Sequence, residues 1–245
     1  MHRCYIDPAD WNDSEMTLTA EERHHLSDVL RAEEGDTVAV FDGKGREATA
    51  RIESHGSKTV LRVLKLESNP RPAFSLTLIQ ALPKGKKMDL IVEKATELGV
   101  SAIHPVITER TIVRLDDNQR KERGERWQRI ALNASRQCGT SWVPDVKPVS
   151  DFTAAVKECG DFDFVVVGSL QADTGQIHSV VDRVRDKKPR RVAAIIGPEG
   201  DLTLNELNEA SSAGAVPVSF GSLVLRVETA ALYVLSVLKY EFGRL

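Results

Sequence analysis

The sequence predicts an α/β protein in which a small β-rich domain precedes a larger domain built on a parallel sheet flanked by helices. Three observations indicate this. Residues 1–70 contain strand-like segments separated by glycine turns. A proline-rich break (NPRP) follows at residues 69–72. After it, apolar strand segments alternate with helical ones, which is typical of a helix-covered parallel sheet. We therefore expect domains at 1–70 and 73–245.

The β-rich part is justified by a hairpin. Residues 37–41 form an apolar strand, residues 42–45 (DGKG) a turn, and residues 48–52 an alternating strand. A third strand is expected at residues 59–66. The segment 43–48 also fits the dinucleotide-binding pattern Gly-x-Gly-x-x-Ala, but a strand follows it where that pattern requires a helix. We therefore interpret it as a turn.

The second part begins with a strand at residues 75–81 and a helix whose apolar residues recur at helical spacing from Met88 to Leu98, with Gly99 as its C-terminal cap. The other strands are expected at residues 102–107, 164–167, 192–196 and 216–220. A long basic helix is expected at 122–138, and a last helix at 228–242.

The amino-acid composition is typical of a soluble globular protein. Of 245 residues, 41% are hydrophobic and 28% charged, and no run approaches the roughly 20 apolar residues needed to cross a bilayer. The amino terminus lacks the apolar core of a signal peptide. Cys4, Cys138 and Cys159 form no Cys-x-x-Cys pair, so we expect reduced thiols and no metal site. We expect a cytoplasmic protein without a membrane partner.

Residues 197–200 (GPEG) are the sharpest local motif. They follow an apolar strand and precede Thr203 and Glu206, which have the spacing of a helix capping box. Such a turn lies at the carboxyl edge of a parallel sheet, where open α/β folds place ligands. The segment is either a ligand loop or an ordinary strand-to-helix turn.

A second strand-to-helix passage, at residues 221–230, is unusually apolar for a connecting segment, since it contains Leu223, Val224 and Leu225. Either these side chains pack under the protein's own chain, or they line a pocket for a flat ligand such as adenine. Arg226 and Glu228, set among them, are either a buried ion pair or catalytic groups.

Basic residues gather at positions 84–87, 110–136 and 183–191, although the net charge is −3. Clustered lysines and arginines favour binding of nucleic-acid phosphates, but each cluster taken alone is more typical of a solvated surface.

Several motifs, in this order, resemble the RsmE family of 16S ribosomal RNA uridine-N3 methyltransferases of the SPOUT class. They are residues 24–31 (HHLSDVLR), 41–43 (FDG), 84–89 (KGKKMD), 93–100 (EKATELGV), 108–110 (TER), 126–127 (RW), 137–139 (QCG), 197–200 (GPEG) and 225–230 (LRVETA). The resemblance covers nearly the whole chain. It implies an N-terminal PUA-like RNA-binding β-barrel and a trefoil-knotted methyltransferase domain.

The resemblance also implies S-adenosyl-L-methionine (SAM) as cofactor, held by three loops. The residues expected to bind it are Gly168, Leu170, Gly197, Pro198, Glu199, Gly200, Phe220, Leu223, Leu225 and Thr229. The expected partners are 16S ribosomal RNA in the small ribosomal subunit and a second copy of the chain, which helps to close the active site.

For the reaction, Arg226 is the candidate for stabilising negative charge on the uracil carbonyls. Glu199 and Glu228 are candidates for accepting the N3 proton, with water as the alternative. The candidates for phosphate contacts are Arg3, Arg31, Lys84, Lys86, Arg110, Arg114 and Arg136.

The chain departs from the family pattern at three positions: Asp201, where a glycine is usual, and Thr140 and Leu223, where arginines are common. These departures keep two alternatives open. One is a related knotted methyltransferase that acts on another RNA or base atom, and the other is a non-catalytic RNA-binding or ribosome-assembly protein.

Overall fold

The computed structural model describes residues 2–24, 26, 32–55, 58–171 and 174–243. The chain forms two compact units. The first comprises residues 1–71 with 132–143, and the second comprises residues 72–131 with 144–245.

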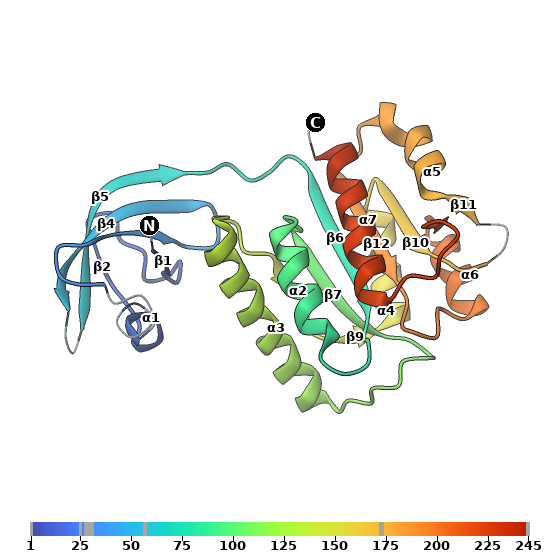
Figure 1. Ribbon diagram of the computed structural model, residues 1–245, viewed down its shortest axis with the longest axis horizontal. Coiled ribbons are helices and arrows are strands. Elements are labelled where there is room, and N and C mark those ends of the chain that lie inside the picture. Colours follow the sequence, from blue (N-terminus) through green and yellow to red (C-terminus); the bar gives the residue numbers. More distant parts are fainter. Residues whose placement is uncertain (1, 25, 27–31, 56–57, 172–173, 244–245) are drawn as a thin grey trace. The chain divides into compact units, whose positions relative to one another are not determined.

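The first unit is built on a curled five-stranded sheet with the order β1-β3-β4-β5-β2 (Figure 1). The strands are β1 (Arg3–Tyr5), β2 (Glu15–Thr17), β3 (Thr37–Phe41), β4 (Arg46–His55) and β5 (Thr59–Ser68). The expected hairpin is confirmed, because β3 pairs antiparallel with β4 and Val40 lies opposite Ala48. The glycine pattern at residues 43–48 continues into β4, as the interpretation as a turn requires.

Apolar side chains fill the interior of this sheet, and a short helix, α1 (Ala20–His24), lies beside it. The fully buried residues include Cys4, Ile6, Met16, Val40 and Leu61. The alternation that identified residues 48–52 as a strand places Ala48, Ala50 and Ile52 in this core.

Residues 132–143 belong to the first unit although they lie far along the chain. They include the C-terminal part of helix α3 (Asp117–Cys138) and the segment that follows. Ser141 fixes this segment, since its carbonyl accepts from Gly45 N at 3.0 Å and its hydroxyl accepts from Asn69 Nδ2 at 2.9 Å. The pattern of strands and helices contained no signal for this long-range association.

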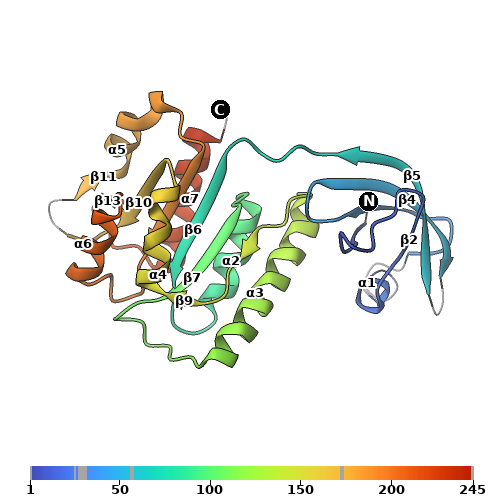
Figure 2. The same ribbon diagram turned by 180° about the vertical axis from the view of Figure 1, so that it is seen from behind.

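The second unit is built on an eight-stranded sheet with the order β11-β13-β10-β12-β6-β7-β8, and β9 also pairs with β7 (Figures 1 and 2). All its pairs are parallel. The strands are β6 (Ser75–Ala81), β7 (Ala102–Ile107), β8 (Asp145–Val146), β9 (Ser150–Asp151), β10 (Phe164–Gly168), β11 (Gly175–Gln176), β12 (Arg191–Ile196) and β13 (Ala215–Ser219). The predicted parallel sheet is confirmed.

Helices cover both faces of this sheet, which explains why its strands are apolar throughout. The helices are α2 (Lys87–Glu97), α4 (Phe152–Val156), α5 (Ile177–Val184), α6 (Leu204–Ser212) and α7 (Val227–Phe242), with 3₁₀ turns at Lys157–Asp161 and Arg185–Lys187. The side chains of successive residues in β12 point to opposite faces of the sheet. Ala194 packs in the core with α2, α5 and α7, while Ile195 packs in the core with α4 and α6.

This topology brings three loops to one edge of the sheet. Strands β10, β12 and β13 run parallel, and β10 lies between the other two. Their carboxyl ends, at Gly168, Ile196 and Ser219, therefore lie at the same edge. The segments that follow these strands come together there.

Candidate functional site

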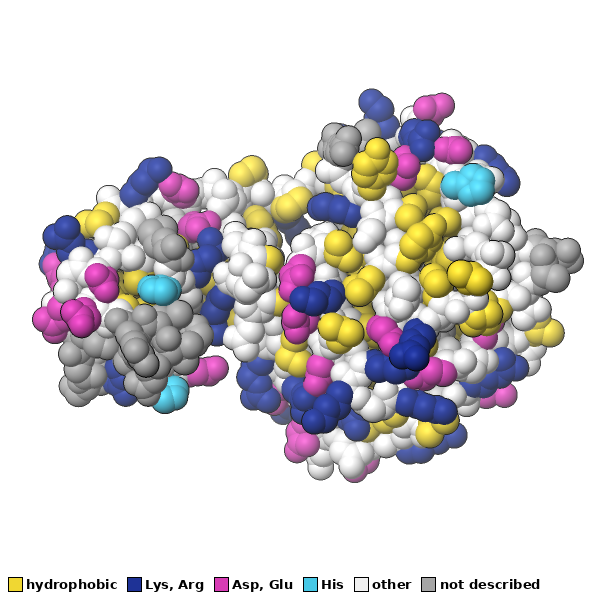
Figure 3. Space-filling model, viewed as in Figure 1, with side chains coloured by type: hydrophobic (Ala, Val, Ile, Leu, Met, Phe, Trp, Pro, Cys, Tyr) yellow, Lys and Arg dark blue, Asp and Glu magenta, His cyan; other side chains and the backbone are white. Residues whose placement is uncertain are grey.

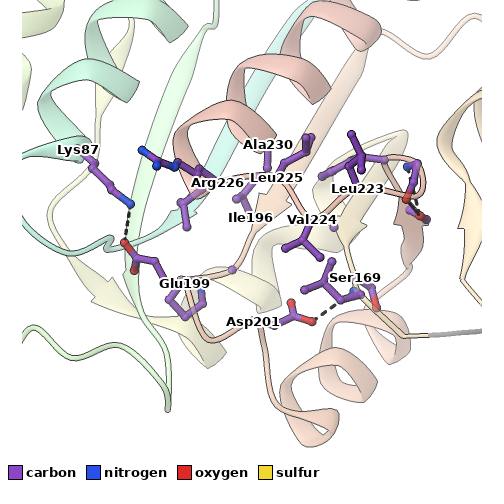
Figure 4. A pocket seen from close by; sticks show the side chains of 18 residues that line it. Lys87, Ser169, Ile196, Glu199, Asp201, Leu223, Val224, Leu225, Arg226 and Ala230 are labelled. Carbon is purple, nitrogen blue, oxygen red and sulfur yellow. Dashed lines mark hydrogen bonds and ion pairs between the residues drawn. The ribbon is translucent and has the colours of Figure 1, made fainter.

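A pocket of about 320 Å³ lies at this carboxyl edge of the sheet (Figure 4). Its walls come from the segments after β10, β12 and β13, from the start of α7, and from Lys87 of α2. The lining residues are Lys87, Gly168, Ser169, Leu170, Ile196, Gly197, Pro198, Glu199, Asp201, Ser219, Phe220, Gly221, Leu223, Val224, Leu225, Arg226, Val227 and Ala230. The volume falls in the usual range for sites that bind cofactors.

Two glycines bring the pocket walls close together. A Cβ atom at Gly168 would lie 3.0 Å from Cε2 of Phe220, and one at Gly197 would lie 3.1 Å from the backbone nitrogen of Leu202. Both distances are shorter than ordinary van der Waals contacts. A larger residue at either position would displace its neighbours, so the shape of the pocket requires glycine there.

The apolar segment after β13 lines the pocket. Leu223 and Val224 are each 77% exposed, and Leu170 on the opposite loop is 61% exposed. Of the two interpretations offered by the sequence, packing under the protein's own chain is wrong for Leu223 and Val224. Their side chains instead provide apolar surface for a bound molecule or a partner.

Lys87 lies between two carboxylates at one side of the pocket. Its Nζ is 3.0 Å from Glu199 Oε1, the contact drawn in Figure 4, and 3.4 Å from Glu228 Oε2. Burial alone would raise the pKa of Glu199, but hydrogen bonds from Lys87 and from backbone N–H groups outweigh it, and the pKa is lowered. The same contacts, with Glu199 the stronger partner, raise the pKa of Lys87. Glu199 is thus held as a carboxylate.

Arg226 occupies the N-cap position of α7 with an exposed side chain. The interpretation of Arg226 and Glu228 as a buried ion pair is wrong, because Glu228 pairs with Lys87 instead. Within the described residues no ion pair or hydrogen bond engages the guanidinium of Arg226. It is therefore a cation at the pocket that is free to meet an anionic group.

The glycine turn at residues 197–200 is anchored from two neighbouring loops. The backbone N–H of Lys84 donates to both carboxylate oxygens of Glu199, at 3.1 and 3.3 Å. Arg110 donates from Nη1 to the Gly200 carbonyl at 2.7 Å and to the Leu202 carbonyl at 3.4 Å. These bonds fix the turn against the ends of β6 and β7.

The structure brings most of the expected cofactor residues together. Those that line the pocket are Gly168, Leu170, Gly197, Pro198, Glu199, Phe220, Leu223 and Leu225, together with the catalytic candidate Arg226. Gly200, Thr229 and Glu228 lie in the same segments but do not line it.

The candidate phosphate-binding residues divide into three groups. Lys84, Lys86, Arg110 and Arg114 are exposed on the loops that follow β6 and β7. Arg31 lies outside the described residues.

Arg3 and Arg136 form the third group, because their guanidinium groups take part in the structure of the first unit. Arg3 pairs with Glu47 at 2.6 Å, donates to the Thr140 carbonyl at 3.1 Å, and has a side chain only 14% exposed. Arg136 pairs with the buried Glu22, and burial lowers the pKa of Arg136. These contacts give both arginines a structural role.

Sequence reasoning missed several residues of the pocket, of which Lys87 and Asp201 carry charge. Lys87 was noticed only as part of a basic cluster, and Asp201 only as a departure from a family pattern. Ser169, Ile196 and Ala230 also line the pocket. Their positions next to expected residues were the available signal.

The described ranges contain neither a membrane-spanning helix nor a cluster of metal ligands. No described helix has both the length and the apolar character to span a membrane. No group of three or more His, Cys, Asp or Glu side chains in the described ranges is arranged to hold a metal ion.

The chain matches two family models. Residues 69–239 match a model described as an RNA methyltransferase domain, and residues 18–64 match one described as an RNA methyltransferase PUA domain. The PUA match confirms a PUA-like domain in the N-terminal part, and the longer match contains every residue that lines the pocket.

Two similar structures contain a bound cofactor. A putative methyltransferase from Legionella pneumophila in complex with SAM is 31% identical, with a TM-score of 0.87 over 97% of this chain and 96% of that one. A ribosomal RNA small subunit methyltransferase E from Neisseria gonorrhoeae bound to S-adenosyl methionine is 29% identical, with a TM-score of 0.84 over 98% and 97%.

The chain is similar to curated relatives over most of their length, and these relatives share one name. The ribosomal RNA small subunit methyltransferase E of Bacillus subtilis is 34% identical over 232 residues, which are 92% of this chain and 90% of the relative. That of Synechocystis is 32% identical over 94% of this chain and 74% of the relative. With its RNA methyltransferase domain, its PUA domain and these relatives, the chain belongs to the ribosomal RNA small subunit methyltransferase E family.

Proposed function

We propose that the protein uses SAM to methylate N3 of a specific uridine in the 16S ribosomal RNA of the small ribosomal subunit. The observation that carries the proposal is the pocket at the carboxyl edge of the parallel sheet, with a free arginine at its rim. The family supports a ribosomal RNA substrate. The choice of uridine and of its N3 atom rests on the resemblance of motifs such as residues 225–230.

The pocket fits SAM. Apolar side chains of Ile196, Leu223, Val224 and Leu225 suit the flat adenine ring, and the volume of about 320 Å³ is in the range of sites that bind small molecules. When bound, SAM supplies a methyl group attached to a cationic sulfur. A nucleophile in line with the carbon–sulfur bond takes the methyl group, and the sulfur leaves as a neutral thioether. The protein's task is to place the base behind that methyl group.

Arg226 is the proposed electrostatic catalyst. Uridine N3 must lose its proton to become a nucleophile, and the negative charge then spreads to the neighbouring carbonyl oxygens. A guanidinium group held near these oxygens favours the deprotonated base. Arg226 suits this role because its side chain is exposed at the pocket and has no anionic partner among the described residues.

The proton acceptor is proposed to be Glu199, Glu228 or water. The lowered pKa of Glu199 keeps it ionised, so it is able to accept a proton, but it also makes Glu199 a weaker base. Glu228 shares Lys87 with it and has a side chain 16% exposed. Both carboxylates therefore act close to the same lysine.

RNA contacts are proposed for the exposed cations Lys84, Lys86, Arg110 and Arg114, on loops at the edge of the sheet that also holds the pocket. Arg3, Arg136 and Arg31 complete the set proposed from sequence. Arg3 and Arg136 are the weaker members, since each already has an anionic partner.

Further properties are proposed on the same resemblance. They are a trefoil knot in the methyltransferase domain, domain limits of 1–70 and 73–245, a cytoplasmic location and a homodimer. Exposed apolar side chains on helix α7 support the homodimer, because a monomer would leave them in water: Tyr233 and Tyr240.

The proposed function is tested by mapping the methylated nucleotide. Small ribosomal subunits from a strain that lacks the modification are incubated with the protein and SAM, and the RNA is analysed by nuclease digestion and mass spectrometry. We expect one methyluridine with the methyl group on N3. A methyl group on another RNA or base atom would point to a related methyltransferase, and SAM binding without transfer would point to an RNA-binding protein that has lost catalysis.

The role of Arg226 is tested in the same assay. Arg226→Ala is expected to slow transfer by about 10²- to 10³-fold, the usual effect of removing one stabilising donor, while SAM affinity changes little. Arg183→Ala, an exposed arginine on α5, is the matched control and should keep full activity. Normal transfer by Arg226→Ala would exclude the proposed role.

A further inference from the structure

Asp201 has an unusual backbone conformation in the wall of the pocket. Its φ is +61°, in the left-handed region that favours glycine, and it directly follows the glycine turn. Aspartate and asparagine are the non-glycine residues that best tolerate this conformation. A carboxylate is thus held at a position whose backbone is suited to glycine.

The carboxylate of Asp201 joins two of the loops that form the pocket. Oδ1 accepts a hydrogen bond from Leu202 N at 2.9 Å, and Oδ2 accepts one from Leu170 N at 3.3 Å, shown as a dashed line in Figure 4. These bonds come from backbone N–H groups alone. Within the described residues no lysine, arginine or histidine forms an ion pair with Asp201, so its negative charge is not neutralised by the protein.

The negative charge of Asp201 affects the net charge of the pocket lining. Of the four charged residues that line it, Lys87 is already shared by Glu199 and Glu228. Arg226 and Asp201 are the two whose charges no described ion pair offsets. Carboxylates have about four lone-pair sites, so two hydrogen bonds leave Asp201 able to interact with a ligand.

We propose that Asp201 makes the pocket select the cationic methyl donor over its neutral-sulfur product. SAM differs from S-adenosylhomocysteine by the methyl group on its sulfur and by the positive charge that this methyl group confers. A carboxylate that lines the same partly enclosed, apolar pocket as the ligand favours the cationic form by on the order of 5- to 10-fold in affinity. Replacement of the bound product by a new molecule of SAM is favoured by the same factor. This inference rests on the proposed use of SAM.

Asp201→Asn is the discriminating variant. Asparagine tolerates the left-handed conformation and keeps one oxygen, which can accept from Leu170 N and so retain the link between the two loops. It removes the charge and the local hydrogen bond from Leu202 N. Dissociation constants for SAM and S-adenosylhomocysteine are measured by calorimetry for both proteins. We expect the preference for SAM to fall about 5-fold or more in Asp201→Asn, through weaker SAM binding with the affinity for S-adenosylhomocysteine nearly unchanged.

Salt provides a second measurement that a structural role would not affect. Raising the ionic strength should reduce the preference for SAM more in the wild-type protein than in Asp201→Asn, because the variant lacks the carboxylate that attracts the cation. Asp201→Gly removes the link between the two loops together with the charge. Loss of the link should weaken the binding of SAM and of S-adenosylhomocysteine alike.

The outcomes separate the inference from the proposed function. If Asp201→Asn keeps the wild-type ratio of affinities, the carboxylate acts only as a link between loops and the inference is overturned. If the folded wild-type protein binds neither ligand, the use of SAM itself fails. Thermal melting of each variant establishes that it is folded.

Discussion

At the scale of single residues, the function of a charged side chain depends on which partner the fold supplies. Lys87 neighbours the exposed Lys86 in sequence, yet only Lys87 reaches Glu199 and Glu228. Arg226 neighbours Glu228 in sequence but is left without an anion among the described residues. The result is a cluster of one lysine and two carboxylates beside an arginine that no described ion pair engages, and this arginine is available to stabilise a developing negative charge.

A pH titration tests the cluster around Lys87. Because the pKa of Glu199 is lowered in the folded protein, its contribution to stability is complete above the ordinary value of 4.5 and is lost as the pH falls through the lowered pKa. Lys87→Met should raise the pKa of Glu199, since the effect of burial then remains with less opposition. Carboxyl-detected NMR titration measures this directly.

Lys86→Met is the control for that titration, because Lys86 is exposed and has no described contact with Glu199. It should leave the pKa of Glu199 where it is in the wild-type protein. Identical titrations of Glu199 in the wild-type and Lys87→Met proteins would contradict the assigned contact.

At the scale of elements, the start of helix α6 fixes the end of the glycine turn. Thr203 Oγ1 accepts from Glu206 N at 3.3 Å, and Glu206 Oε2 accepts from Thr203 N at 2.9 Å, which confirms the predicted capping box. The other oxygen of Glu206 accepts from Glu109 N at 2.8 Å. One helix terminus therefore secures both its own first turn and the loop after β7.

Loss of this cap should be measurable in the free energy of unfolding. Thr203→Ala removes the acceptor for an otherwise unpaired N–H group and is expected to destabilise the protein by about 1 kcal/mol in urea unfolding. Ser211→Ala is a control on the same helix, where the hydroxyl only bonds back to the Leu207 carbonyl. It should change stability by less than about 0.5 kcal/mol. Equal effects of the two substitutions would rule out a special role for the cap.

At the scale of the whole molecule, the second unit exposes apolar side chains where a water-facing surface is expected. Hydrophobic side chains gather over helix α7 and beside it (Figure 3). Tyr240 of α7 is 64% exposed, Tyr233 of the same helix is 41% exposed, and Leu223 and Val224 precede the helix. Contiguous apolar surface of this kind marks an interface more often than a solvated face.

Sedimentation equilibrium tests the proposed homodimer. The wild-type protein is expected to sediment as a dimer, and Tyr240→Glu should weaken association at least 10-fold by placing a charge in the apolar interface. Leu204→Glu is a matched control, because Leu204 is 60% exposed but lies on α6. A wild-type monomer at micromolar concentration would refute the dimer, and an undiminished Tyr240→Glu dimer would place its interface elsewhere.

The sequence by itself determined the features that depend on neighbouring residues. The five longer strands of the parallel sheet, the 37–52 hairpin, the turn at Gly197 and the Thr203 capping box were predicted from local patterns, because side-chain periodicity and capping act within a few residues. The two-residue strands β8, β9 and β11 were not predicted. The order of motifs also identified the family. The short strands β1 and β2 have three residues each and gave no such pattern.

Only the tertiary structure decided which distant residues meet. It paired Glu228 with Lys87 rather than Arg226, joined Asp201 to Leu170, and placed residues 132–143 in the first unit. It also engaged Arg3 and Arg136 in ion pairs, although the sequence suggested RNA contacts for them. Such contacts depend on how strands far apart in the chain are ordered in a sheet, and that order follows from packing of the whole core, which local residue patterns do not specify.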